Sequence, residues 1–343
     1  KRYKWTSSNP EVATVDEKTG LVTGISKGDA TIIVTADDFS SNPVSASCEI
    51  GVKIVTPITG MTFTEDAELN QLGYGQEYQI KYTLEPVDAT ASLLTWTSDN
   101  PEVISVDKTG KLKVHTTKAA SAVITASYGP VVQNVTVTVA DGRFWYSLGN
   151  GLGNGLDNNW YLDGNNASVV SSDGNKTTVQ MGGPDSKVKY RGDLWLARSG
   201  KGKVVNITPA EYRYLAVKIG FKSQLHVGNN SQGCIKLEVF DDGIKKIGPE
   251  YWGTAGDANN RYAILGTSEI SITKPNVLYY DLQARYKTVT PTDWNQVFDL
   301  VQCKFVIADF PETAQTYDLY WIRSFKSIEE LQAFVDSENN TNE

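Results

Sequence analysis

The chain has 343 residues, a length that predicts two or three domains, each able to bury its own core. Hydrophobic residues make up 40% and charged residues 21%, and no uninterrupted apolar run approaches the roughly 20 residues of a membrane-spanning helix. The net charge of -8 has the wrong sign for binding phosphate backbones, so no nucleic-acid partner is expected. Two histidines and three cysteines are too few and too scattered for a structural zinc site, and no metal site is assigned.

An internal repeat organises the N-terminal part of the chain. Residues 5–16, which begin Trp-Thr-Ser-Ser-Asn-Pro, recur at residues 96–107 as Trp-Thr-Ser-Asp-Asn-Pro. Each copy continues into a Lys-Thr-Gly turn and then a β-branched run, which is typical of strands. Gly20 and Gly110 stand where these tight turns require a positive φ, and the tryptophan that opens each copy is predicted to be core. The pattern predicts two small β-sandwiches.

The repeat resembles the bacterial immunoglobulin-like (Ig-like) group 2 module. Its signature W-x-S-x-N-x-x-V-A-x-V is followed by a glycine turn and a G-x-A-x-I-x-V strand, which residues 28–34 match. The resemblance implies Ig-like modules at residues 1–55 and 56–141. Only four residues precede Trp5, so we expect the first module to lack its opening strands and Lys1 not to be the biological N-terminus.

The third region, residues 142–343, has a different composition. It contains most of the tryptophans and several Gly/Asn loops, with short strand patterns between them. No alternating helix pattern is present to cover a parallel sheet, so this region predicts a larger jelly-roll-type β-sandwich. A short C-terminal helix is predicted after Ser327, because Glu330 completes a capping box and the apolar residues that follow fall on one helix face. The predicted fold class is therefore all-β.

Catalytic machinery is not evident. Asp and Glu show no distinctive pairing for glycoside hydrolysis, and neither His115 nor His226 lies in a nucleophile motif. The glycine-rich stretch 149–155 lacks the strand–loop–helix context of a phosphate loop, and fits a turn-forming or binding loop better. Residues 241–243, Asp-Asp-Gly, form either a hairpin turn or a structural calcium site. We expect no other cofactor.

Aromatic residues in polar loops indicate a glycan site. Sugars present C–H faces that stack on flat rings and hydroxyls that hydrogen-bond to amides and carboxylates. Segments 157–161, 249–253 and 292–296 combine these side chains, and 192–198 adds a further tryptophan. The candidate carbohydrate-binding residues are Trp160, Trp252, Trp294, Tyr251, Tyr161, Asn158, Asn159, Glu250, Asp293 and Trp195.

The closing stretch of residues 317–325, followed by the helix after Ser327, is similar to the C-terminal domains of surface glycan-binding proteins encoded in Bacteroidetes polysaccharide utilisation loci. This resemblance implies polysaccharide binding without cleavage, with the Ig-like modules as spacers. It also implies a cell-surface outer-membrane lipoprotein whose anchor is not in this chain, and a possible outer-membrane glycan importer as partner. We expect a monomer.

The sequence therefore predicts a non-catalytic protein that binds an extracellular polysaccharide by aromatic stacking. No Lys/Arg cluster surrounds the loop aromatics, which favours a neutral β-glucan over an acidic glycan. Two alternatives stay open. One is a glycoside hydrolase, as accessory or catalytic domain with an atypical acid pair, and the other is a surface adhesin or structural Ig-like protein.

Overall fold

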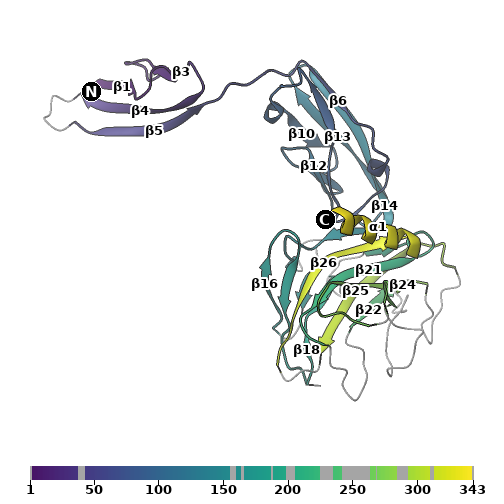
Figure 1. Cartoon of the computed structure of the whole chain (residues 1–343). Coiled ribbons are helices and arrows are strands. Elements are labelled where there is room, and N and C mark those ends of the chain that lie inside the picture. Colours follow the sequence, from purple (N-terminus) through teal and green to yellow (C-terminus); the bar gives the residue numbers. More distant parts are fainter. Residues whose placement is uncertain are drawn as a thin grey trace. The chain divides into compact units, whose positions relative to one another are not determined.

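The computed structural model is all-β with a C-terminal helix, which confirms the predicted fold class (Figure 1). It forms two compact units, residues 1–62 with 83–93, and residues 63–82 with 94–343, which are described separately. The residues that the structure describes are 2–37, 43–154, 160–163, 166–186, 188–197, 205–224, 235–241, 263–267, 269–283, 293–309 and 313–341.

The first unit holds the first Ig-like module. A three-stranded antiparallel sheet has the order β1-β4-β5, and a β2-β3 hairpin accompanies it. Val12, Ala13 and Ala30 form its small buried cluster. The strands are β1 (Arg2–Ser7), β2 (Ala13–Val15), β3 (Val22–Gly24), β4 (Gly28–Asp37) and β5 (Ser45–Val52), and a further pair is β6 (Gly60–Phe63) with β9 (Tyr82–Glu85).

The turn glycines of the repeat have the conformation that the sequence predicts. Gly20 has φ +74° and Gly110 has φ +83°. A Cβ at Gly20 would lie 2.7 Å from Trp5 Cε2, and one at Gly110 would lie 2.6 Å from Trp96 Cζ2. Glycine is therefore needed at each position for two reasons. The backbone is left-handed, and the tryptophan ring leaves no space for a Cβ. Trp96 is buried as predicted, whereas Trp5 is half-buried.

The second Ig-like module belongs to the second unit. One antiparallel sheet has the order β10-β13-β14, and another has the order β11-β12-β8. Leu72, Ile104, Leu112 and Ile124 are fully buried in its core. The strands are β7 (Leu72–Tyr74), β8 (Glu77–Gln79), β10 (Thr95–Ser98), β11 (Ile104–Val106), β12 (Lys111–Val114), β13 (Ala120–Tyr128) and β14 (Val131–Ser147).

Strand β14 passes directly from this module into the third region. Its residues 131–139 pair with β13, and its residues 145–147 pair with β26 (Thr316–Phe325). The boundary predicted at residues 141–142 thus falls inside a continuous strand. Gly142 has φ +68°, and a Cβ there would lie 2.6 Å from the Thr208 backbone nitrogen.

The third region is a sandwich of two sheets. In the first sheet β26 lies between β17 and β21, with β16 beyond β17 and with β24 and β23 beyond β21. In the second, β25 pairs with β18, β19, β20 and β22, and β15 lies beyond β19. The strands are β15 (Tyr161–Asp163), β16 (Ser168–Ser172), β17 (Thr177–Gln180), β18 (Tyr190–Arg191), β19 (Asp193–Ala197), β20 (Val205–Ile207), β21 (Tyr214–Phe221), β22 (Ile235–Asp241), β23 (Ala263–Ile264), β24 (Asn276–Asp281) and β25 (Phe298–Asp309).

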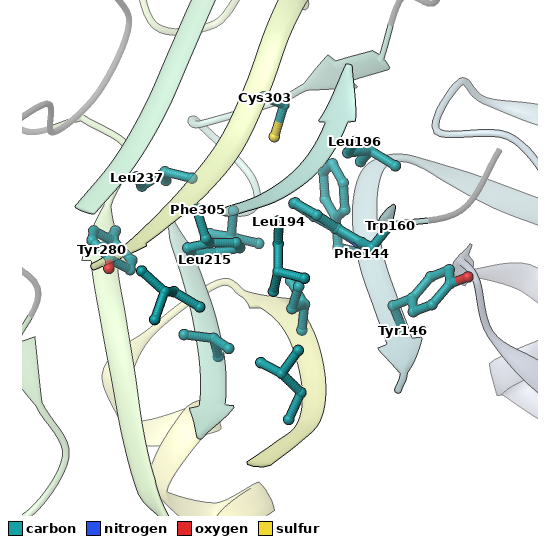
Figure 2. Packing of buried hydrophobic residues seen from close by; sticks show 14 of the residues in the cluster. Phe144, Tyr146, Trp160, Leu194, Leu196, Leu215, Leu237, Tyr280, Cys303 and Phe305 are labelled. Atoms are coloured by element: carbon teal, nitrogen blue, oxygen red, sulfur yellow. The ribbon is translucent and has the colours of Figure 1, made fainter. Parts of the chain in front are cut away.

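The main core lies between these two sheets (Figure 2). Leu194, Leu237 and Phe305 enter it from the second sheet, and Leu215 and Tyr280 from the first. Helix α1 (Ile328–Thr341) covers the other side of the first sheet, where Leu331 and Phe334 pack with Trp321. The predicted cap is present, because the Glu330 backbone nitrogen donates to Ser327 Oγ at 3.2 Å.

Candidate functional site

Trp160 does not take the surface position predicted for it. Its side chain is fully buried in the main core, and its ring centre lies 5.4 Å from that of Phe305 (Figure 2). Side chains alternate along the strand that follows, so Trp160 and Leu162 face the core and Tyr161 faces away from it. The prediction that Trp160 stacks on a sugar is therefore wrong. The polar residues around it in the sequence concealed an inward-facing position.

The other loop candidates have different outcomes. Trp294 is half-buried, with its ring centre 5.9 Å from that of Phe298, so part of it packs against the core. Asp293 is exposed and its Oδ1 accepts the Asn295 backbone N–H at 2.8 Å, which forms a local turn. Sugar contact by these two residues stays a prediction. The remaining candidates, which lie outside the described residues, are Asn158, Asn159, Glu250, Tyr251 and Trp252.

Two predicted aromatic residues from distant segments are direct neighbours. Tyr161 on β15 is paired with Trp195 on β19 in the antiparallel register. The residues next to them, Leu162 and Leu194, face the core, so both rings lie on the opposite side of the sheet. Both are half-buried. The sequence named both residues but gave no reason to place them together.

Polar side chains continue this row across the sheet. Lys304 on β25 is paired with Trp195, and its Nζ lies 4.4 Å from the centre of the indole ring. Glu238 on β22 is paired with Lys304 from the other side, and its Oε2 lies 2.9 Å from Lys304 Nζ. Lys236 forms an ion pair with the other carboxylate oxygen, and Gln302 Nε2 donates to Oε2 at 3.1 Å. We call this set the polar face: Tyr161, Trp195, Lys236, Glu238, Gln302 and Lys304.

The charges of the polar face largely neutralise each other. Burial acts to raise the pKa of Glu238, but Lys236 and Lys304 outweigh it and hold that pKa below its usual value. The carboxylate is therefore ionised at neutral pH and shared by two ammonium groups. These three side chains carry one net positive charge, held next to the Trp195 ring.

Asp193 lies two residues before Trp195 on the same strand and hence on the same side. Its Oδ2 accepts from Arg191 Nη2 at 2.5 Å, and its Oδ1 accepts the Ile307 backbone N–H at 3.3 Å. Burial raises the pKa of Asp193 in spite of the nearby guanidinium. The pKa values of Asp193 and Glu238 are thus shifted in opposite directions, as they are in catalytic carboxylate pairs. However, each of their four carboxylate oxygens already accepts a hydrogen bond or an ion pair, as structural carboxylates do.

Two described strands of the second sheet border the predicted segments in the sequence. β15 begins at Tyr161, and β25 begins at Phe298, shortly after Trp294. β22, which is antiparallel to β25, ends at Asp241 opposite Leu300.

No group of three or more His, Cys, Asp or Glu side chains that could hold a metal ion occurs in the described ranges. The side chain of Asp241 and residues 242–243 lie outside them, so calcium stays a prediction. His115 Nε2 lies 2.8 Å from Ser105 Oγ, and burial lowers its pKa. Among the described helices, none has the length and apolar character to cross a membrane.

Comparison with known families matches two parts of the chain. Residues 151–331 match the family described as "Domain of unknown function (DUF4979)". Residues 1–45 match "Bacterial Ig-like domain (group 2)", which confirms the resemblance seen in the first module. An uncharacterised protein of Clostridium acetobutylicum is 29% identical over 127 residues, which are 37% of this chain and 12% of that protein. The chain thus spans only a small part of that relative.

Solved structures give weak similarities. Domains 4–9 of the surface layer protein SbsC align over 87% of this chain and 38% of that one, at 16% identity and a TM-score of 0.21. A structure of carbohydrate-binding modules of the β-sandwich superfamily aligns over 95% and 98%, at 12% identity and a TM-score of 0.27. Scores this low support no conclusion about function.

Proposed function

The chain belongs to the family described as Domain of unknown function (DUF4979), and on that premise we propose that its C-terminal sandwich binds an extracellular polysaccharide without cleaving it. The observation that carries the proposal is the pairing of Tyr161 with Trp195 on the polar face. Two adjacent rings offer a stacking surface for the C–H faces of sugars. Gln302, a half-buried residue of the same face, offers its side-chain amide to sugar hydroxyls.

The absence of cleavage is supported by the state of the two carboxylates. A glycoside hydrolase needs one acid that can protonate the leaving oxygen and a second carboxylate across the bond. Asp193 is held by Arg191 and a backbone N–H, and Glu238 is held by two lysines. Neither group has an oxygen directed to a substrate alone. We therefore assign binding rather than hydrolysis to this face.

The charge of the ligand is the finer part of the proposal. The sequence favours a neutral β-glucan because no basic cluster surrounds the loop aromatics, yet Lys304 lies against the Trp195 ring. Since Lys304 and Lys236 are both engaged by Glu238, we keep a neutral β-glucan as the proposed ligand. An acidic polysaccharide is the rival to measure. The cell-surface location, the lipid anchor and the importer partner stay proposals that rest on the resemblance.

A polysaccharide panel tests this proposal. The full chain is run in native gels that contain a β-glucan, an α-glucan or a polyuronate, and each mixture is assayed for reducing ends. We expect retardation by the β-glucan and no release of reducing ends. Release would establish the hydrolase alternative, and no retardation by any polysaccharide would leave the adhesin alternative. Stronger retardation by the polyuronate would replace the neutral ligand with an acidic one.

A further inference from the structure

Gly220 lies in β21 and is paired with Asp318 of β26, at a place where the fold does not require a glycine. It does not have the left-handed backbone of the turn glycines, although the pairing has a bulge between Lys218 and Ile219, just before it. A Cβ on Gly220 would lie 3.6 Å from Asp318 Cβ and 3.7 Å from Tyr320 Cε2, which are ordinary van der Waals contacts. Neither backbone nor packing therefore accounts for the open floor over Gly220. Approach of a ligand to the backbone is a common reason for a glycine within a strand, where it otherwise lowers stability.

The open floor faces away from the main core. Both neighbours of Gly220 in β21 belong to that core, so Gly220 faces the other side of the sheet. Asp318 and Tyr320 face the same side, because Leu319 between them belongs to the core. Tyr320 is half-buried, and helix α1 packs beyond it against Trp321. An aromatic ring and a carboxylate group thus border the floor.

The carboxylate is shared by two lysines that reach solvent. Asp318 Oδ2 accepts from Lys176 Nζ at 2.7 Å and from Lys222 Nζ at 2.6 Å, and Oδ1 accepts from Thr178 Oγ1 at 2.7 Å. Burial acts to raise the pKa of Asp318, but these three hydrogen bonds outweigh it and hold that pKa below its usual value. The Asp318 side chain is 3% exposed, whereas those of Lys176 and Lys222 are 30% and 50% exposed. Each ammonium group therefore keeps N–H donors for an outside acceptor.

The polar face has the same arrangement on the other sheet. There Glu238 is the buried carboxylate, two lysines share it, and Trp195 is the aromatic ring beside them. The lysines of the polar face are only 10% and 12% exposed. The set around Gly220 thus combines the same groups with more accessible donors.

We propose that this part of the first sheet is a second sugar-binding site, the Gly220 site, formed by Lys176, Gly220, Lys222, Asp318 and Tyr320. The choice of a neutral β-glucan as its ligand rests on the proposed function. The sugar ring lies over Gly220 and against the Tyr320 ring, and the two ammonium groups donate to its hydroxyls. The site has one aromatic ring where the polar face has two, so it should bind roughly tenfold more weakly. Because the two sites lie on opposite outer sides of the sandwich, one molecule holds two polysaccharide chains.

Isothermal titration calorimetry of the full chain tests this site, with cellohexaose and laminarihexaose as soluble β-linked probes. We expect one strong and one weak site per molecule. Gly220→Val should weaken the weak site roughly tenfold or more, because its side chain fills the floor. Gly220→Ala should also weaken it without lowering the melting temperature, because the added Cβ makes only ordinary contacts. Ser121→Val, at an exposed position of β13, is the control and should leave both sites unchanged.

Trp195→Ala separates the two sites, since it should weaken the strong site and leave the weak one intact. A single site that Trp195→Ala weakens and the Gly220 variants do not would overturn the Gly220 site and leave the proposed function standing. A single site weakened by the Gly220 variants alone would support the Gly220 site and overturn the polar face. No binding of either hexamer by the parent would overturn both. A lowered melting temperature of Gly220→Ala would contradict the open floor.

Discussion

Asn206 in the sandwich donates from Nδ2 to Asp141 Oδ1 at 2.6 Å, at the point where β14 leaves the second Ig-like module. Thr117 of that module donates to Asn206 Oδ1 at 2.5 Å and accepts from the Asn206 backbone nitrogen at 3.0 Å. Asn206 is fully buried. The module and the sandwich are therefore joined by a satisfied polar network as well as by a shared strand, and the module is more than a detachable spacer.

Removing this network should loosen the junction. Asn206→Ala leaves the buried Thr117 hydroxyl without its acceptor and removes one donor from Asp141, which should cost about 1–3 kcal/mol in the free energy of unfolding. Differential scanning calorimetry should show one transition for the module and sandwich together in the parent, and a lower or divided transition in the variant. Asn134→Ala, at an exposed site on β14, is the matched control. Equal melting of the two variants would show that the network does not couple the two parts.

Substitution of Gly110, the turn glycine of the second repeat, should lower the free energy of unfolding for two separable reasons. Gly110→Ala combines an unfavourable positive φ with a Cβ that would lie 2.6 Å from Trp96 Cζ2. Gly129 also has a positive φ, +55°, but a Cβ there meets nothing within 4 Å. Gly129→Ala should cost about 1–2 kcal/mol for the backbone alone. Gly110→Ala should cost a further 1–3 kcal/mol or so for overpacking, measured by urea unfolding. Equal free-energy costs for the two variants would mean that the Trp96 indole can move away from the added Cβ without loss of stability.

Trp160 should now behave as a core residue. Trp160→Ala should lower the free energy of unfolding of the sandwich by about 3–5 kcal/mol, because it opens a cavity beside Phe305. Thermal unfolding followed by near-UV circular dichroism measures this directly. A melting temperature equal to that of the parent would contradict the buried position.

The lowered pKa of Glu238 makes a signed prediction about pH. A carboxyl group whose folded pKa is depressed stabilises the fold above its ordinary pKa, 4.5, and loses that contribution as the pH falls through the folded value. At pH 7, Glu238→Gln should cost about 3–5 kcal/mol, because Lys236 and Lys304 remain buried without their counter-ion. The difference between parent and variant should shrink below pH 4.5.

Chemical denaturation of both proteins from pH 7 to pH 3 measures this difference. The comparison cancels the contribution of Asp193, whose raised pKa changes stability in the opposite sense in both proteins. A difference that stays constant over the whole range would contradict the ionised, paired state of Glu238.

Local sequence signals predicted the features that local physics controls. The repeat, its turn glycines and the Ser327 cap each depend on neighbours within a few residues, and the structure contains all three. The end of the strand alternation predicts a domain boundary at the Asp141-Gly142 step, and this boundary stays a prediction. In the structure the step lies within the continuous strand β14 and closely approaches Thr208, which only the tertiary structure reveals.

The polar face could not be predicted from the sequence, for a related reason. The sequence pattern shows only ordinary polar positions of alternating strands at Lys236, Glu238 and Lys304. No local pattern predicts that these side chains pair. Register across β19, β25 and β22 brings them beside Trp195. The polar neighbours of Trp160 in the sequence predict an exposed side chain, but the strand that begins after it determines which side chains face the core.

The measurement that tests the account most directly is the affinity of Trp195→Ala for β-glucan, determined by isothermal titration calorimetry. Stacking of a sugar on the indole should contribute on the order of 1–3 kcal/mol, so the variant should bind roughly tenfold or more weakly. Its melting temperature should stay close to that of the parent, because the side chain is only half-buried. Undiminished affinity in a folded Trp195→Ala protein would contradict the polar face as the glycan site.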